Sequence, residues 1–148
     1  MSTGLLPPAM FTFTTDPIRV RYADTDQMGY VYYGNYARFF EIARVEALRS
    51  LGISYKELET SGVMMPVYDL KTSYHKPARY DDLLRVRVTI PELPTVRILF
   101  SYEVLNETGD RLNTGETTLV FQRMDTGRLC KAPDALLDRL KPFFGPNS

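Results

Sequence analysis

One segment of this sequence, from about Asn35 to Leu51, has the apolar spacing of a long helix, and it constrains the fold more than any other. Apolar side chains recur there at steps of three and four residues, the period of one helix face. They are Tyr36, Phe39, Phe40, Ala43, Ala47, Leu48 and Leu51. Asn35 is a plausible N-cap, and Gly52 follows as the expected C′ residue. A stripe this wide requires cover, so the rest of the chain must supply a surface for it.

The segments after this helix alternate in the manner of β-strands. Val67 to Tyr74 is compatible with a strand, and residues 84–90 and 96–104 show clear alternation of apolar and polar side chains. A last strand face lies at 117–121. Short connections between consecutive strands favour antiparallel pairing. The pattern therefore predicts an α+β fold, with one long helix against a curved antiparallel sheet.

Shorter elements complete the expected order. Ile18 to Tyr22 indicates a short, half-exposed strand, and helical pieces are expected at 54–60 and 135–140. The chain has 148 residues, which suits one domain. We expect residues 1–15 to be a lead-in without periodicity, residues 16–142 to form the domain, and residues 143–148 to form a tail.

Composition excludes several classes of protein. The 18 Lys and Arg balance 18 Asp and Glu, so no basic excess marks a nucleic-acid binder. One His and one Cys are too few for a structural zinc site, and Cys130 alone makes no internal disulfide. No apolar run is long enough to span a bilayer. We expect no membrane span, no metal and a cytoplasmic location.

The segment from Tyr22 to Tyr36 has the apolar period of neither a helix nor a strand. It places two carboxylates, Asp24 and Asp26, just before the long helix. Free backbone N–H groups and the positive end of the helix dipole would lie near them. That arrangement can hold a carboxylate beside a polarised carbonyl, as acyl transfer requires. Aspartates before a helix are also ordinary caps and turn formers, so the residues alone leave both interpretations open.

The same segment carries a family resemblance. Asp26-x-Met-Gly-x-Val-Tyr-Tyr-x-Asn-Tyr36, followed by Phe-Phe-Glu-x-Ala-Arg-x-Glu46, resembles the motif of the 4-hydroxybenzoyl-CoA thioesterase family. These proteins are acyl-CoA thioesterases with the hotdog fold, a long helix wrapped by a curved sheet. The resemblance extends through Tyr74-x-Lys-Pro-Ala-Arg-Tyr-Asp-Asp82 and Gly115-Glu-Thr-Thr-Leu-Val120. It covers residues 17–141 approximately, in the element order already described.

The resemblance implies roles for individual residues. Asp26 is the catalytic carboxylate, acting as nucleophile or as general base for water, and the backbone N–H of Tyr33 polarises the thioester carbonyl. Many relatives have His where Tyr33 stands, but a backbone donor is unaffected by that difference. Arg128 and Lys131 are candidates for binding the phosphates of coenzyme A. Asn35 is a candidate cap and substrate-site residue, with orientation of the loop as the alternative role.

The resemblance also implies the partners. The substrate is an acyl-CoA, or an acyl group on acyl carrier protein, and the chemistry needs no cofactor. Relatives place the active site at a subunit boundary, so a homodimer or homotetramer is expected. A non-catalytic acyl-CoA-binding protein remains the alternative, since fold does not fix function. A hotdog dehydratase is disfavoured, because the lone His75 lies far along the chain from the helix segment.

The remaining candidate residues have simpler interpretations. We expect Asp24 to be a turn residue and Cys130 to be an inert structural thiol. His75 has no obvious nucleophile beside it. Lys76, Arg79 and Arg123 are basic residues near strands that could also meet phosphates. The tyrosines of the loop could line an acyl pocket or serve packing; they are Tyr30, Tyr32, Tyr33 and Tyr36.

Overall fold

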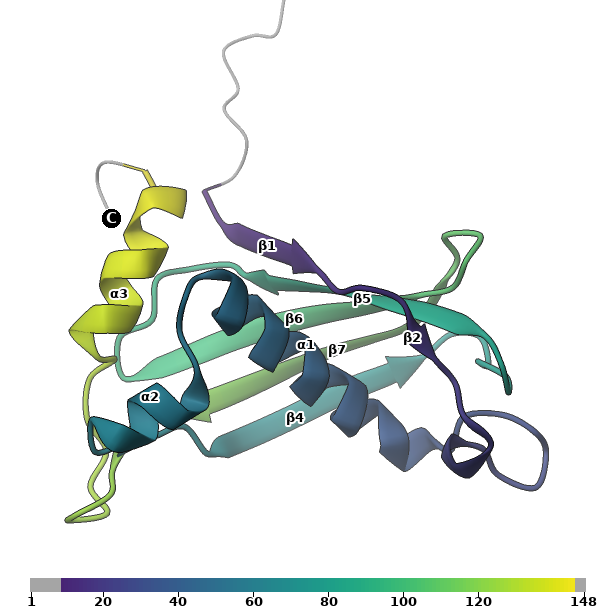
Figure 1. Ribbon diagram of the computed structural model, residues 1–148, viewed down its shortest axis with the longest axis horizontal. Helices are drawn as coiled ribbons and strands as arrows, with labels where there is room; N and C mark the ends of the chain where they lie inside the picture. Colours follow the sequence, from purple (N-terminus) through teal and green to yellow (C-terminus); the bar gives the residue numbers. More distant parts are fainter. Residues whose placement is uncertain (1–8, 146–148) are drawn as a thin grey trace, which may run out of the picture.

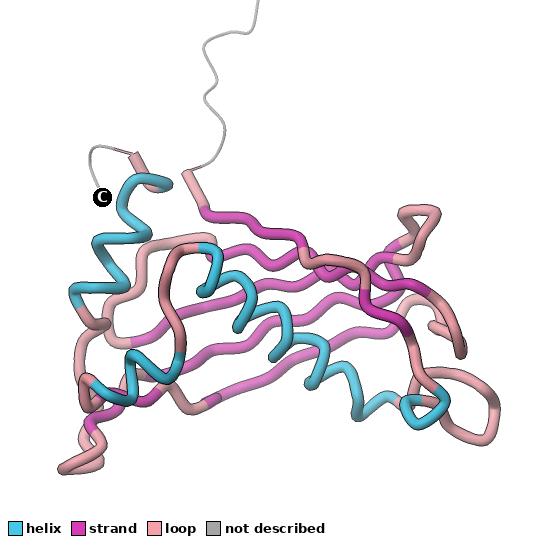
Figure 2. Tube along the Cα trace, viewed as in Figure 1, coloured by secondary structure: helices cyan, strands magenta, loops and turns pink. Residues whose placement is uncertain are grey.

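A computed structural model describes residues 9–145, so residues 1–8 of the predicted lead-in and residues 146–148 of the predicted tail lie outside the described residues. One long helix, α1 (Tyr36–Ser50), lies across one face of an antiparallel sheet, as Figures 1 and 2 show. The predicted α+β architecture is therefore confirmed. Among the helices within 9–145, none is long and apolar enough to cross a membrane.

The sheet consists of strands β1 (Phe11–Thr14), β2 (Ile18–Arg19), β4 (Val67–Tyr74), β5 (Leu83–Ile90), β6 (Arg97–Leu105) and β7 (Arg111–Val120). A separate pair is formed by β3 (Val63–Met64) and β8 (Gln122–Arg123). The smaller helices are α2 (Tyr55–Thr60) and α3 (Asp134–Leu140). Single 3-10 turns occupy Tyr22–Asp24, Tyr33–Asn35 and Lys141–Phe143.

Strand order in the sheet is β1-β5-β6-β7-β4, with β2 also pairing β5. Consecutive strands pair as expected from β5 through β7, but β4 pairs with β7 and not with the next strand, β5. The connection at 75–82 passes the start of α1, where Val31 N–H donates to the Ala78 carbonyl at 2.8 Å. This crossover leaves β5, β6 and β7 under the helix and puts β4 at the edge.

Phe40 fixes how closely α1 approaches the sheet. Its ring stacks on Tyr102 of β6 with centroids 4.3 Å apart. Gly115 of β7 lies opposite Tyr102, and a Cβ at this position would lie 2.5 Å from the Phe40 ring. The contact therefore requires a residue without a side chain at position 115.

Two predictions for the N-terminal part are wrong. Phe11–Thr14 form β1, paired with β5 in the register Phe11 to Ile90, although the lead-in was expected to lack regular structure. The physical reason is a period of two, in which buried Phe11 and half-buried Phe13 alternate with exposed threonines. The predicted strand from Ile18 ends already at Arg19, because the chain turns into the 3-10 helix at Tyr22.

The C-terminal segment also packs on the domain. The 3-10 turn extends to Phe143, where the predicted tail begins, and Phe144 is buried. The Phe143 ring lies edge-on to Phe11 of β1, with centroids 4.9 Å apart. The two ends of the described chain therefore meet beside β1. The domain limits at residues 16 and 142 themselves stay predictions.

Candidate active site

Asp24 fastens the loop that precedes α1. It is buried, and its carboxylate accepts hydrogen bonds from Arg21 N–H at 2.8 Å and from the Arg38 guanidinium at 2.5 Å. Its carbonyl oxygen accepts from Tyr32 N–H at 2.9 Å and from the Asn35 side-chain amide at 2.8 Å. These contacts agree with the prediction that Asp24 is a turn residue, since its polar atoms bind the loop and the first turn of α1.

Asp26 is held by one carboxylate oxygen and leaves the other free. Its Oδ1 accepts from Met28 N–H at 2.9 Å and from Tyr30 N–H at 3.2 Å. The turn that brings these amides round needs Gly29, whose φ of +80° is the left-handed region that favours glycine. Oδ2 makes no hydrogen bond with another residue in the range 9–145. The half-buried carboxylate is thus oriented through Oδ1, while Oδ2 stays available to a substrate.

Two backbone amides at the helix start have no acceptor. The 3-10 turn Tyr33–Asn35 runs directly into α1, and the first N–H groups of a helix lack an intrahelical partner. Within the described residues, neither Tyr33 N–H nor Gly34 N–H donates a hydrogen bond. The Tyr33 carbonyl accepts from the Tyr74 hydroxyl at 3.2 Å, which ties this turn to the end of β4. The free amides are donors suited to an oxyanion.

Asn35 lies at the N-cap position of α1, as predicted, but its side chain makes no capping hydrogen bond. Its backbone is already helical, at φ −79° and ψ −12°, because the 3-10 turn precedes it. Side-chain capping needs a non-helical backbone at that position. The side chain instead binds the Asp24 carbonyl, which is the alternative of orienting the loop. A contact between Asn35 and substrate stays a prediction.

A pocket of about 290 Å³ lies between this loop and the end of β4. Its lining includes Asp26, Tyr33, Tyr36, Tyr74, His75 and Lys76. Burial raises the pKa of Tyr36, against the lowering effect of a hydrogen bond with the Ala78 backbone, so this phenol stays neutral at ordinary pH. The pocket is therefore rich in aromatic surface and has a carboxylate and helix-start amides in its wall.

His75 lies in the wall of the same pocket as Asp26, although the sequence places it far from the helix segment. Its Nε2 lies 3.0 Å from the Thr114 hydroxyl, and its backbone N–H donates to the Leu112 carbonyl. The crossover at 75–82 brings it there. The only signal for this placement in the sequence was the second segment of the family motif, which begins at Tyr74.

Comparisons with known proteins agree with this arrangement. Residues 20–140 match the model of the thioesterase-like superfamily. The chain belongs to the thioesterase-like superfamily. It is 38% identical over 93 residues to the putative acyl-CoA thioesterase YneP of Bacillus subtilis, covering 63% of this chain and 67% of that protein. It is 35% identical over 104 residues to the acyl-CoA thioester hydrolase YbgC of Escherichia coli, covering 70% and 78%.

A solved thioesterase structure is also similar to this thioesterase-like chain, in both fold and sequence. The DHNA-CoA thioesterase of Staphylococcus aureus superposes with a TM-score of 0.78 at 37% identity, covering 88% of this chain and 84% of that one. The hotdog fold expected from the motif is thereby confirmed.

The predicted phosphate ligands of the thioesterase-like chain lie away from Asp26. Arg128 and Lys131 follow β8, and β8 pairs with β3 just before the Val67 end of β4. Asp26 shares its pocket with Tyr74, at the opposite end of β4. The two ends are also separate in Figure 1, where the yellow-green hairpin and the loop before α1 lie at opposite sides. Within one chain, these basic residues and Asp26 are not brought together.

The described residues contain no cluster of side chains that could serve as metal ligands. Nowhere in residues 9–145 do three or more His, Cys, Asp or Glu side chains gather closely enough to hold a metal ion. Arg79, the other basic residue near the loop, lies over the Tyr30 ring at 5.5 Å. The polar groups that the Asp26 pocket itself offers are the Asp26 carboxylate, the helix-start amides, His75 and Lys76, between aromatic walls.

Proposed function

We propose that this protein hydrolyses an acyl-CoA thioester to the free acid and coenzyme A, with Asp26 as the reacting carboxylate. One observation carries the proposal: the free oxygen of Asp26 and the unbonded amides of the helix start belong to one pocket-lining loop. Membership in the thioesterase-like superfamily and the names of YneP and YbgC support the same activity.

The geometry supports a simple reaction. The thioester carbonyl oxygen accepts from Tyr33 N–H, and the positive end of the helix dipole stabilises the negative charge that develops on it. Asp26 Oδ2 either attacks the carbonyl carbon or takes a proton from the water that attacks. In the first case the thiolate leaves, and water then cleaves the resulting anhydride. Both routes consume one water and yield acid and thiol.

The edge of the sheet supports a dimer built along β4. This strand pairs with β7 on one side and with no described strand on the other. Four of its apolar side chains, Val67, Tyr68, Leu70 and Tyr74, are exposed. An unpaired edge with exposed apolar side chains is a template for another chain. Two copies related by a two-fold axis would pair their β4 strands antiparallel.

Antiparallel pairing would complete the site. It lays the Val67 end of one β4 beside the Tyr74 end of the other. The β8 hairpin at the Val67 end, with Arg128 and Lys131, then lies beside the partner's Asp26 pocket. This places basic side chains where the phosphates of coenzyme A would leave that pocket. The proposed dimer would thus bring together residues that lie apart within one chain.

A substrate panel tests the proposal. Wild-type protein should release free thiol from at least one acyl-CoA in a panel of short, long and aromatic acyl groups, as measured with a thiol-detecting reagent. The same acyl groups on acyl carrier protein distinguish the two carriers. Binding of a non-hydrolysable thioether analogue is measured in parallel. Tight analogue binding with no thiol release from any substrate would contradict hydrolysis and favour a binding protein.

A further inference from the structure

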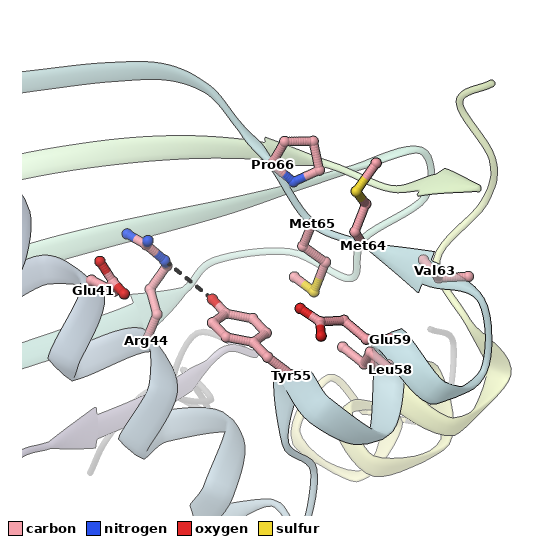
Figure 3. Close-up of a pocket in the computed structure, with 9 residues that line it drawn as sticks. All are labelled: Glu41, Arg44, Tyr55, Leu58, Glu59, Val63, Met64, Met65 and Pro66. Atoms are coloured by element: carbon pink, nitrogen blue, oxygen red, sulfur yellow. Dashed lines mark hydrogen bonds between the residues drawn. The ribbon is translucent and has the colours of Figure 1, made fainter. Parts of the chain in front are cut away.

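Arg44, in the middle of α1, is a buried cation that forms no ion pair with a carboxylate of residues 9–145. Only 7% of its surface is exposed. Its Nε donates to the Tyr55 hydroxyl at 3.3 Å, and its Nη1 donates to the Tyr102 hydroxyl at 3.1 Å (Figure 3 shows the first of these). Within residues 9–145 it forms no ion pair, and its Nη2 donates no hydrogen bond. Buried arginines are normally paired, and Nη2 keeps some accessible surface, so it can donate to an acceptor that enters beside it.

The two hydroxyls around Arg44 do not supply a negative charge. Burial raises the pKa of Tyr102 to about 12, although Arg44 and Thr117 pull it down. Burial likewise raises the pKa of Tyr55. Burial alone would lower the pKa of Arg44, but the tyrosine interactions outweigh it and raise that pKa above its ordinary value. At neutral pH the hydrogen bonds that the charged guanidinium donates to residues in 9–145 therefore go to neutral phenols, and the nearby Glu41 carboxylate forms no ion pair with it.

Arg44 lies in the wall of a cavity of about 330 Å³ that is separate from the Asp26 pocket. Figure 3 shows Arg44 and Tyr55 toward one end, with Met64, Met65 and Pro66 facing them across the space. Glu41 and Glu59 also line the cavity, but both are exposed and neither pairs with Arg44. Apolar walls with a buried donor suit an apolar group that carries an oxygen at its far end.

The position of this cavity relates it to the partner's active site. Pro66 directly precedes β4, whereas the Asp26 pocket adjoins Tyr74 at the other end of that strand. In the antiparallel β4 dimer, the Met65–Pro66 wall of one chain therefore lies beside the partner's Asp26 pocket. An acyl group held there by its thioester would extend into the cavity that contains Arg44.

We infer that Arg44, positioned by Tyr55 and Tyr102, is a specificity-determining residue that binds an oxygen at the distal end of the acyl group held in the partner's Asp26 pocket. This inference rests on the proposed thioesterase function. A hydroxyl and a carboxylate each have an oxygen that can accept a hydrogen bond from Nη2. The site then selects acyl groups with a distal oxygen over plain hydrocarbon ones.

Matched substrates test this selection. Hexanoyl-CoA, omega-hydroxyhexanoyl-CoA and adipoyl-CoA differ only in the distal group, so their kcat/KM ratios measure what Arg44 recognises. Wild type should prefer one of the two oxygenated substrates, and Arg44→Met should reduce that preference about ten- to a hundredfold, the usual effect of a hydrogen bond to a charged group. Tyr55→Phe keeps the guanidinium but loosens it, so its loss should be smaller and in the same direction.

Mixed dimers test the contribution across subunits. In a dimer of one Asp26→Asn chain and one Arg44→Met chain, isolated by two affinity tags, the only intact Asp26 faces the intact Arg44 of the other chain. It should keep the wild-type preference. A preference like that of the Arg44→Met homodimer would place Arg44 in its own chain's site and overturn the inference.

Two further outcomes are informative. Equal kcat/KM for all three substrates in wild type would overturn the inference while leaving hydrolysis intact. A folded Arg44→Met protein with the wild-type substrate preference would also overturn the inference. If Arg44→Met does not fold, the substrate preference of Tyr55→Phe is compared with wild type in its place. Failure of the proposed function is distinct, because wild type would then release thiol from no substrate.

Discussion

The centre and the edge of the sheet carry the same alternation but have opposite surroundings. On β5, Val86 and Val88 point toward α1 and are fully buried. On β4, Leu70 and Tyr68 repeat the apolar alternation, yet 39% and 65% of their surfaces are exposed. Alternation specifies a strand, but it does not specify what covers that strand. In this chain the uncovered stripe adjoins both the Asp26 pocket and the Arg44 cavity, so the edge is where we place function.

The largest effect on the assembly of the chains should come from a charge on the edge. Leu70 lies near the middle of β4, so Leu70→Lys would place two ammonium groups close together across the proposed two-fold axis. The dimer would lose an apolar contact and gain a repulsion between like charges. We expect a shift from dimer to monomer in light scattering at micromolar concentration, with thioester hydrolysis reduced at least tenfold because each site loses its second half.

Val96→Lys is the matched control for that change. Val96 is a 46% exposed aliphatic side chain in the turn before β6, a strand that does not pair with β4. Its replacement should leave both the particle mass and the activity as in wild type. A Leu70→Lys protein that stays dimeric and active would show that the chains do not associate along β4.

A smaller effect is expected at the centre of the sheet. Gly115→Ala forces a methyl group against the Phe40 ring, and overpacking of this kind typically costs about 1–3 kcal/mol of stability. The free energy of unfolding in urea should fall by that amount, while the folded fraction keeps its oligomeric state and its substrate preference. Equal stability of Gly115→Ala and wild type would show that α1 can shift and does not need this close contact.

The spacing of apolar residues and the residue types at the helix ends predicted the features that depend on neighbouring residues alone. The apolar stripe gave α1 within a residue or two, and Gly52 ends it with φ +82° as expected of a C′ glycine. Asn35 occupies the predicted N-cap position without a side-chain cap, because it belongs to a 3-10 turn that makes its backbone helical and that its residue type does not reveal. Neighbouring residues control each of these outcomes.

Contacts between distant segments could not be predicted in the same way. Asp26 was identified by family resemblance, since a turn-forming aspartate has the same local pattern. His75 reaches the Asp26 pocket only because the chain crosses from β4 to β5 past the helix start. Arg44 meets Tyr102, 58 positions away, through the packing of α1 on β6. An arginine on a helix face gives no sign of such burial in the sequence.

The most direct measurement of the central claim compares hydrolysis and binding in Asp26→Asn. Asparagine keeps an oxygen that can accept from the Met28 and Tyr30 amides, so the loop should keep its shape. Asp16→Asn is the matched control, because Asp16 is exposed and makes no hydrogen bond or ion pair with any residue in 9–145. We predict that kcat/KM falls about 10²–10⁴-fold in Asp26→Asn, while the Kd of a thioether analogue and the Asp16→Asn kinetics match wild type. Equal kcat/KM in wild type and Asp26→Asn would contradict the role of Asp26.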